Sequence, residues 1–296
     1  MTGHKIVGNL SKPFALLLLI LAAEGMYVAI PRIPLLFSRL EVSILSPLCT
    51  EIYPVYVALD DRSLTNLEET NFEVTVDNRP VQFRLIKSRT INAMVLLDTS
   101  GSMATPSKIE AGKEMTRFVA DTALRSGGKV ALITFSDKID VKCDWTDNAD
   151  IVNRAINDLQ ASGSTRLWDS IRESTPYLQV MHSSKPCQIS LLVVISDFMD
   201  TGSQTSQEQA LTELERTETL AVAIVYGSVF DASLTSAEAL AKATHGRSLR
   251  ANDAKEAISQ LQRLLESIYY FEIKEKGHIK ITARYMERTG EDEIDS

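Results

Sequence analysis

The fold of this chain is constrained most by apolar segments that alternate with segments of helical periodicity. Ala93–Leu97 is entirely apolar and Ile189–Ile195 nearly so, as expected for strands buried on both faces of a sheet. Between them, apolar residues such as Ile109, Met115 and Val119 recur at helical spacing. Strands that alternate with helices predict an α/β domain with a doubly wound, mostly parallel sheet flanked by helices.

The rest of the chain predicts β-structure on both sides of this domain. Short alternating runs separated by turns predict a small antiparallel β segment over residues 39–90. The α/β domain is expected over residues 91–270, with Ile139–Cys143 as an antiparallel edge strand after a tight turn. Residues 271–296 are expected to hold C-terminal strands and a solvated acidic tail, because the last residues are mostly Asp and Glu.

Residues 1–38 resemble a targeting segment. Lys5 and Lys12 precede the apolar run Phe14–Ala23, and Glu24 interrupts it. An uninterrupted run of about ten residues fits a signal-peptide core, whereas the stretch counted through Glu24 approaches membrane-spanning length. Both a cleaved signal and an uncleaved membrane anchor stay open, and the lysines place the rest of the chain outside the cytoplasmic membrane in either case.

Composition excludes several classes of protein. The net charge of −8 over 296 residues argues against a nucleic-acid partner, which requires a basic face. Three cysteines are too few for a disulfide scaffold, and the four histidines are isolated in the sequence, so a zinc site has little support.

Oxygen-bearing side chains follow the first apolar strand. Asp98, Ser100 and Ser102 alternate directly after it, and Gly101 permits a backbone that β-branched residues resist. A loop that leaves a strand can turn such alternate side chains towards one point. These three residues are therefore candidate ligands of one cation.

Two further oxygen donors are expected at the same edge of the sheet. Asp197 directly follows the strand Ile189–Ile195, and Thr165 lies in a loop before a predicted helix. Ligands of open α/β sheets bind at the carboxyl ends of the strands. Two carboxylates and three hydroxyls suit Mg²⁺, Mn²⁺ or Ca²⁺, and they leave the cation able to accept a carboxylate from a partner protein.

The sequence from Asp98 to Ser102, Asp-Thr-Ser-Gly-Ser, resembles the metal-ion-dependent adhesion motif (MIDAS) of von Willebrand factor type A domains. Thr165 and Asp197 resemble its second and third elements. The resemblance implies direct ligation by the two serines, with Thr165 and the aspartates bound directly or through water. It also implies that Asp169 supports the loop. The preceding β segment resembles that of bacterial exported or membrane-anchored members.

One position departs from the family pattern. Glycine usually follows the third-element aspartate, and this chain has Phe198 there. We expect a stiffer loop at that point. Local packing and an exposed apolar rim for a partner are alternative roles for Phe198 and Met199.

Three functions are compared. An oxygen-only site without an adjacent base or nucleophile favours a non-enzymatic, divalent-metal-dependent protein-binding module, acting in adhesion or assembly outside the membrane. A metal-independent structural module of an envelope complex is the alternative. A Mg²⁺-dependent phosphoryl-transfer enzyme is less favoured, because such enzymes place a second carboxylate where this chain has Ser100.

Overall fold

The computed structural model describes residues 39–45, 51–59, 62–86, 90–184, 188–227, 231–286 and 288–295. The targeting segment expected over residues 1–38 lies outside the described residues and stays a prediction. Arg39–Ser296 forms one compact unit. Among the helices that the structure describes, none combines the length and apolarity needed to cross a membrane.

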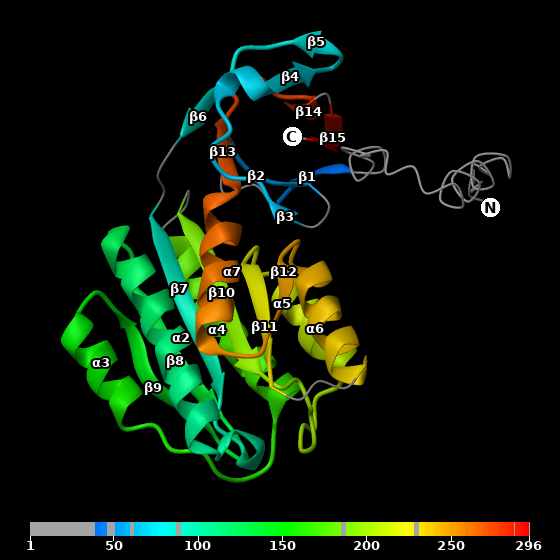
Figure 1. The fold of residues 1–296 in the computed structure, drawn as a ribbon. Helices are drawn as coiled ribbons and strands as arrows, with labels where there is room; N and C mark the ends of the chain where they lie inside the picture. The colour runs from blue at the N-terminus through cyan, green and yellow to red at the C-terminus, as the bar shows by residue number, and fades with distance from the viewer. Residues whose placement is uncertain are drawn as a thin grey trace, which may run out of the picture. The chain divides into compact units, whose positions relative to one another are not determined.

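The centre of this unit is a six-stranded sheet in the order β12-β11-β10-β7-β8-β9 (Figure 1). Five strands run parallel, and β9 pairs antiparallel with β8 at one edge. The predicted α/β class with a mostly parallel sheet is therefore confirmed, and so is the antiparallel edge strand. The strands are β7 (Ile91–Asp98), β8 (Val130–Phe135), β9 (Ile139–Thr146), β10 (Ile189–Ser196), β11 (Leu220–Tyr226) and β12 (Arg247–Ala251).

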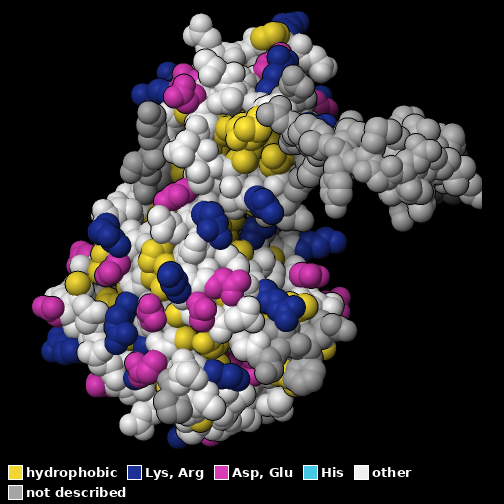
Figure 2. Space-filling model, viewed as in Figure 1, with side chains coloured by type: hydrophobic (Ala, Val, Ile, Leu, Met, Phe, Trp, Pro, Cys, Tyr) yellow, Lys and Arg dark blue, Asp and Glu magenta, His cyan; other side chains and the backbone are white. Residues whose placement is uncertain are grey.

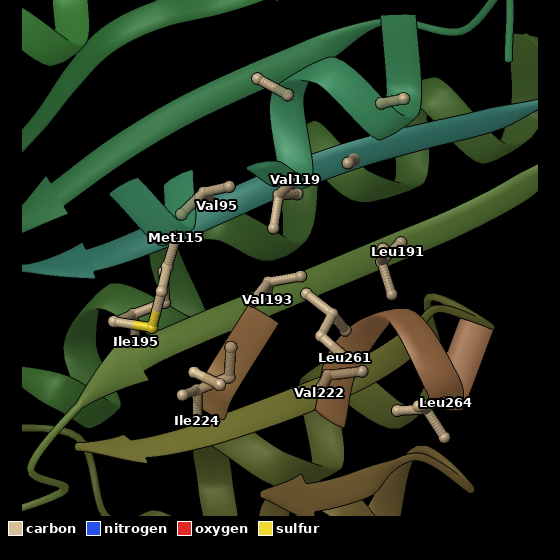
Figure 3. Packing of buried hydrophobic residues seen from close by; sticks show 14 of the residues in the cluster. Val95, Met115, Val119, Leu191, Val193, Ile195, Val222, Ile224, Leu261 and Leu264 are labelled. Atoms are coloured by element: carbon tan, nitrogen blue, oxygen red, sulfur yellow. The ribbon is translucent and has the colours of Figure 1, made fainter. Parts of the chain in front are cut away.

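Helices cover both faces of the sheet because successive strand residues point to opposite sides. Val95 and Leu97 of β7 pack in one core with α2, α3 and α7, as seen around Val95, Met115 and Leu261 in Figure 3. Met94 and Leu96 pack in a second core with α4, α5 and α6. The helices are α2 (Pro106–Arg125), α3 (Ala149–Asn157), α4 (Leu167–Ser184), α5 (Gln207–Glu215), α6 (Asp231–Ala243) and α7 (Ala254–Glu266).

A β-sandwich is built from both ends of the described chain. One sheet has the order β1-β2-β13-β6 with β3 paired to β2, and the other has the order β15-β14-β4-β5. Apolar residues of both sheets, such as Val55, Val74 and Ile281, share a third core. The strands are β1 (Leu40–Ile44), β2 (Ile52–Leu59), β3 (Arg62–Ser63), β4 (Phe72–Val76), β5 (Arg79–Pro80), β6 (Arg84–Ile86), β13 (Ile268–Glu272), β14 (His278–Tyr285) and β15 (Arg288–Asp295).

The sandwich corrects two expectations. The predicted acidic tail is wrong, because residues 288–295 pair with β14 along its whole length. Opposite charges meet across this pair, with Lys280 Nζ 2.8 Å from Glu291. The boundary expected at residue 270 also falls inside β13, and the segments expected over 39–90 and 271–296 form one structure rather than two.

The sandwich and the predicted metal loops lie at opposite ends of the central sheet (Figure 1). Strand β7 follows β6 of the sandwich and ends at Asp98. Tyr56 and Ala58 of β2 join the same core as Leu264 of α7, so the sandwich docks on the α/β domain. The loops at the carboxyl ends of β7 and β10 therefore form the end that faces away from the sandwich.

Candidate metal site

The first loop of the candidate site leaves β7 at a fully buried carboxylate. Asp98 is 0% exposed, and its Oδ1 accepts a hydrogen bond of 2.8 Å from the Ser100 N–H. The short helix η3 (Gly101–Met103) then turns the chain. The hydroxyl oxygens of Ser100 and Ser102 lie 3.2 Å apart, with Ser100 buried and Ser102 exposed. Three of the predicted ligands thus line one path from the interior to the surface.

The second loop is joined to the first by its backbone. The Ser162 N–H donates to the Thr99 carbonyl at 2.7 Å, and the Gly101 N–H donates to the Gly163 carbonyl at 2.8 Å. A Cβ atom on Gly101 would lie 3.2 Å from that carbonyl oxygen. Glycine is therefore favoured at 101 by the close approach of two loops, and its φ is not positive. This contact places the loop of Thr165, which is 5% exposed, beside the serine loop.

The third loop begins with a serine that sequence analysis did not select. Ser196 ends β10 and is fully buried. Its hydroxyl donates to Asp98 Oδ2 at 2.6 Å and accepts from the Phe198 N–H at 2.9 Å. Asp197, 6% exposed, accepts from the Met199 N–H at 3.1 Å. Ser196 thus holds Asp98 and the Asp197 loop together, and only its place at a strand end could have indicated this role.

Phe198 adopts the backbone conformation that glycine adopts without cost. Its φ is +58°, in the left-handed region that disfavours side chains. The side chain is 2% exposed and packs in the core formed with α4, α5 and α6. Of the two expected roles, local packing applies to Phe198, whereas Met199 is 40% exposed. Burial of the ring offsets the strain of the turn.

Asp169 anchors the end of the third loop from α4. Its carboxylate accepts hydrogen bonds from the N–H groups of Gln204 and Thr205 and pairs with Arg166 at 2.7 Å. Burial alone would raise the pKa of Asp169, but the hydrogen bonds from Thr205, Gln204 and Arg166 outweigh it and lower the pKa to about 2. Asp169 is therefore ionised and engaged in the loop, as its supporting role predicts. Arg166 is engaged by the same carboxylate.

The electrostatics at Asp98 fit a bound cation. Burial raises the pKa of Asp98, and the nearby Asp197 carboxylate raises it further. Hydrogen bonds from Ser100 and Ser196 lower the pKa, but the net shift is upward. Among the described residues, no lysine, arginine or histidine forms an ion pair with Asp98 or Asp197. Two carboxylates in a desolvated setting thus lack a countercharge, which a divalent cation would supply.

The chemistry of the donors limits which cation fits. Within the described ranges, no group of three or more His, Cys, Asp or Glu residues is placed to hold a metal. A cation at this site would therefore draw on the hydroxyl oxygens of Ser100, Ser102 and Thr165 in addition to the carboxylates of Asp98 and Asp197. Hard oxygen donors of this kind suit Mg²⁺, Mn²⁺ and Ca²⁺.

Comparison with known proteins places the site within a domain family. A family model described as the von Willebrand factor type A domain matches residues 93–200, which include all five candidate ligands. A comparison with curated protein sequences gives no match.

Solved structures resemble this chain at low sequence identity, and two of the following three have TM-scores above 0.5. Proximal thread matrix protein 1 from the mussel byssus is 16% identical, with 62% of this chain and 48% of that chain covered and a TM-score of 0.52. A structure of the same protein with a zinc-occupied MIDAS motif is 15% identical, with 65% of this chain and 50% of that chain covered and a TM-score of 0.51. BatB from Bacteroides thetaiotaomicron is 14% identical over 60% of this chain and 100% of that chain, with a TM-score of 0.49.

Proposed function

Residues 93–200 of this chain are a von Willebrand factor type A domain, and from this premise we propose that the chain is a non-enzymatic protein-binding module. Its binding depends on a divalent cation at the carboxyl ends of β7 and β10. A carboxylate of the partner protein completes the coordination of the cation. The observation that carries the proposal is the buried Asp98 carboxylate, which lies near the Asp197 carboxylate. Among the described residues, no lysine, arginine or histidine forms an ion pair with either group.

The donor set supports binding rather than catalysis. Asp98, Ser100, Ser102, Thr165 and Asp197 offer oxygen atoms only, and the loops that carry them are fixed to one another by hydrogen bonds. Two carboxylates leave a divalent cation coordinated by neutral hydroxyls on its remaining sides. Such a cation attracts a further anionic ligand. The zinc-occupied MIDAS motif of the mussel byssus protein supports the capacity of this fold to hold a divalent ion.

The outer rim of the site supports an acidic partner. Ser102 is exposed, and the Lys108 ammonium donates to its carbonyl oxygen at 3.0 Å. A partner carboxylate that reaches the cation therefore also meets a positive charge close by. Met199 adds an exposed apolar contact. These features favour a protein ligand with a carboxylate flanked by apolar side chains.

The N-terminal segment supports a location outside the cytoplasmic membrane. Lysines precede an apolar run in residues 1–38, which favours transfer of the following chain across the membrane. We propose that the module is secreted or periplasmic, or is held at the membrane surface by this segment.

Thermal unfolding with and without metal tests the proposal. We expect Mg²⁺ or Mn²⁺ to raise the Tm of the wild type, because a ligand that binds only the folded state stabilises it. Ser102→Ala should remove most of the increase, since it deletes an exposed ligand without opening the core. Ser107→Ala, an exposed serine in the first turn of α2, is the matched control and should keep the increase.

Affinity capture then tests the function itself. Partner recovery from membranes should require Mg²⁺, fail in EDTA and fail with Ser102→Ala. Equal recovery with and without EDTA would contradict the metal-dependent function and favour the metal-independent structural module.

A further inference from the structure

We propose that the groove between the β-sandwich and strand β12 binds an extended acidic segment of a partner protein, which adds to β12 as a further strand. The groove has a volume of about 1200 Å³ and is lined by β12, α6 and α7 on one side and by β1, β2 and β3 on the other. The sandwich, which forms one wall of the groove, lies at the end of the sheet opposite the metal loops (Figure 1). The groove therefore offers a second binding surface that does not depend on the proposed metal function.

No described strand pairs with β12 on its outer side, so an added strand would have to displace only side-chain contacts there. β12 is the last strand of its sheet and pairs with β11 alone among the described strands. The Arg250 carbonyl accepts a hydrogen bond of 3.0 Å from the Gln260 side chain of α7, so this carbonyl points away from β11. The N–H and C=O of one residue lie on the same side of a strand and alternate sides along it. Ser248 and Arg250 therefore turn their backbone groups to the groove.

Positive charge surrounds this open edge. Arg62, Lys242, Arg250 and Arg263 line the groove and are exposed, and lysine and arginine side chains gather below the sandwich in Figure 2. Within the described residues none of the four forms an ion pair. This concentration of charge occurs in a chain with a net charge of −8, and it favours an acidic ligand.

The groove walls are fixed by a separate set of contacts. Arg247 pairs with Glu41 of β1, and its guanidinium lies 4.1 Å from the centre of the Tyr56 ring. These contacts connect β12 to the sandwich. They also pair one cation of the lining, Arg247, with Glu41, which is one of the two acids among the described lining residues. Among the described residues that line the groove, Glu238 is then the only acid that opposes the four exposed cations.

The positive charge of the groove also favours a segment of a partner protein over a segment of this chain as the ligand. Residues 1–38 contain Lys5, Lys12 and Arg32 against the single acid Glu24, so they carry the same sign as the groove. The acidic strand β15 is already paired with β14, and its Asp292 accepts a hydrogen bond from the Ile44 N–H. A partner segment with alternating acidic side chains satisfies both the charge and the strand edge.

A synthetic peptide tests the groove directly. The probe is a fluorescent eight-residue peptide of alternating Glu and Val with blocked ends, added to the full chain in detergent at low salt with EDTA. We expect binding that weakens at high salt, and no binding of the Lys-Val peptide of the same length. Lys242→Glu with Arg250→Glu should weaken binding at least tenfold. The control pair Lys142→Glu with Arg154→Glu, at the opposite edge of the sheet, should change it less than twofold.

Hydrogen exchange distinguishes strand addition from charge attraction alone. The peptide should slow exchange of the β12 amides of Ser248 and Arg250, and a peptide N-methylated at every second residue should bind at least tenfold more weakly. The proposal is overturned if the wild type does not bind the acidic peptide, if the basic peptide binds equally, if the double reversal has no effect, or if N-methylation is tolerated. Amides already protected without peptide would assign the groove to the chain itself and also overturn it.

Discussion

Asp169→Asn tests the hydrogen-bonded clamp that the Asp169 carboxylate forms with Gln204, Thr205 and Arg166. Asparagine keeps the size of the side chain and removes its charge. The pKa of Asp169 is lowered from 3.8 to about 2, so the folded state favours the ionised carboxylate. At about 1.4 kcal/mol per pKa unit, the ionised form contributes about 2.4 kcal/mol to the free energy of unfolding at pH 7. The side chain is nearly inaccessible to solvent, so solvent screening does not reduce this value greatly.

The sign of the pH dependence follows from the lowered pKa. The unfolded state binds the proton more tightly than the folded state, so this stabilisation is present above pH 3.8 and disappears as the pH falls through 2. By pH 3 roughly 1 kcal/mol of it is lost. We therefore expect Asp169→Asn to cost about 2 to 3 kcal/mol at pH 7 and about half as much at pH 3.

Urea unfolding followed by tryptophan fluorescence measures this difference. The chain has two tryptophans, Trp145 in β9 and Trp168 in α4, so the signal reports on the α/β domain. EDTA removes any contribution from metal. Asp150→Asn, which changes an exposed first-turn residue of α3, is the control and should cost less than about 1 kcal/mol. A loss at pH 7 no larger than that of the control, or an equal loss at both pH values, would refute the reasoning.

Three further predictions concern the neighbouring residues. Burial raises the pKa of Asp98, so without metal its contribution to stability falls as the pH rises through that pKa. Asp98→Asn should therefore raise the Tm in EDTA at neutral pH and abolish the increase in Tm that Mg²⁺ causes. A lower Tm of this variant in EDTA would count against the reasoning. Ser196→Ala should cost about 1 to 3 kcal/mol in urea unfolding and weaken Mg²⁺ binding in calorimetry, whereas unchanged affinity would exclude a role in positioning Asp98. Phe198→Gly should relieve about 1 to 2 kcal/mol of backbone strain but lose about 3 to 5 kcal/mol of stabilisation from the buried ring. Urea unfolding should therefore show a net loss of stability of about 2 kcal/mol. A gain in stability would show that the strain is the larger effect.

The central sheet was predictable because its signals are local. The apolar run Ala93–Leu97 identifies a strand buried on both faces, and helical periodicity identifies the segments between strands. The β-sandwich was only partly predictable, because β2 pairs with β13 and β4 with β14 across some 200 residues. The acidic strand β15 was missed because its charge pattern resembles a solvated tail, and the partner charges on β14 that stabilise it become visible only in the pairing.

The candidate site was predictable to the extent that strand ends determine it. Parallel strands bring their carboxyl ends to one edge, so Asp98 and Asp197 could be placed together from the sequence. Ser196 could not be selected, because a serine at the end of a strand has many roles. The conformation of Phe198 was also hidden, since a positive φ at a large side chain depends on a core position formed by distant helices.

The pairing of the two ends of the chain in the sandwich determines when the molecule can be completed during synthesis. Strands β7 to β12 and their helices are contiguous in the chain and can fold as soon as they emerge. β2 and β4 can pair with β13 and β14 only after the α/β domain has been made. A chain that stops before residue 268 would therefore hold a formed α/β domain, and the apolar strand Ile52–Leu59 would keep β1 but lack its neighbour β13. Such an exposed edge promotes aggregation, so chains that stop before β13 should aggregate more readily than chains that include β13 to β15.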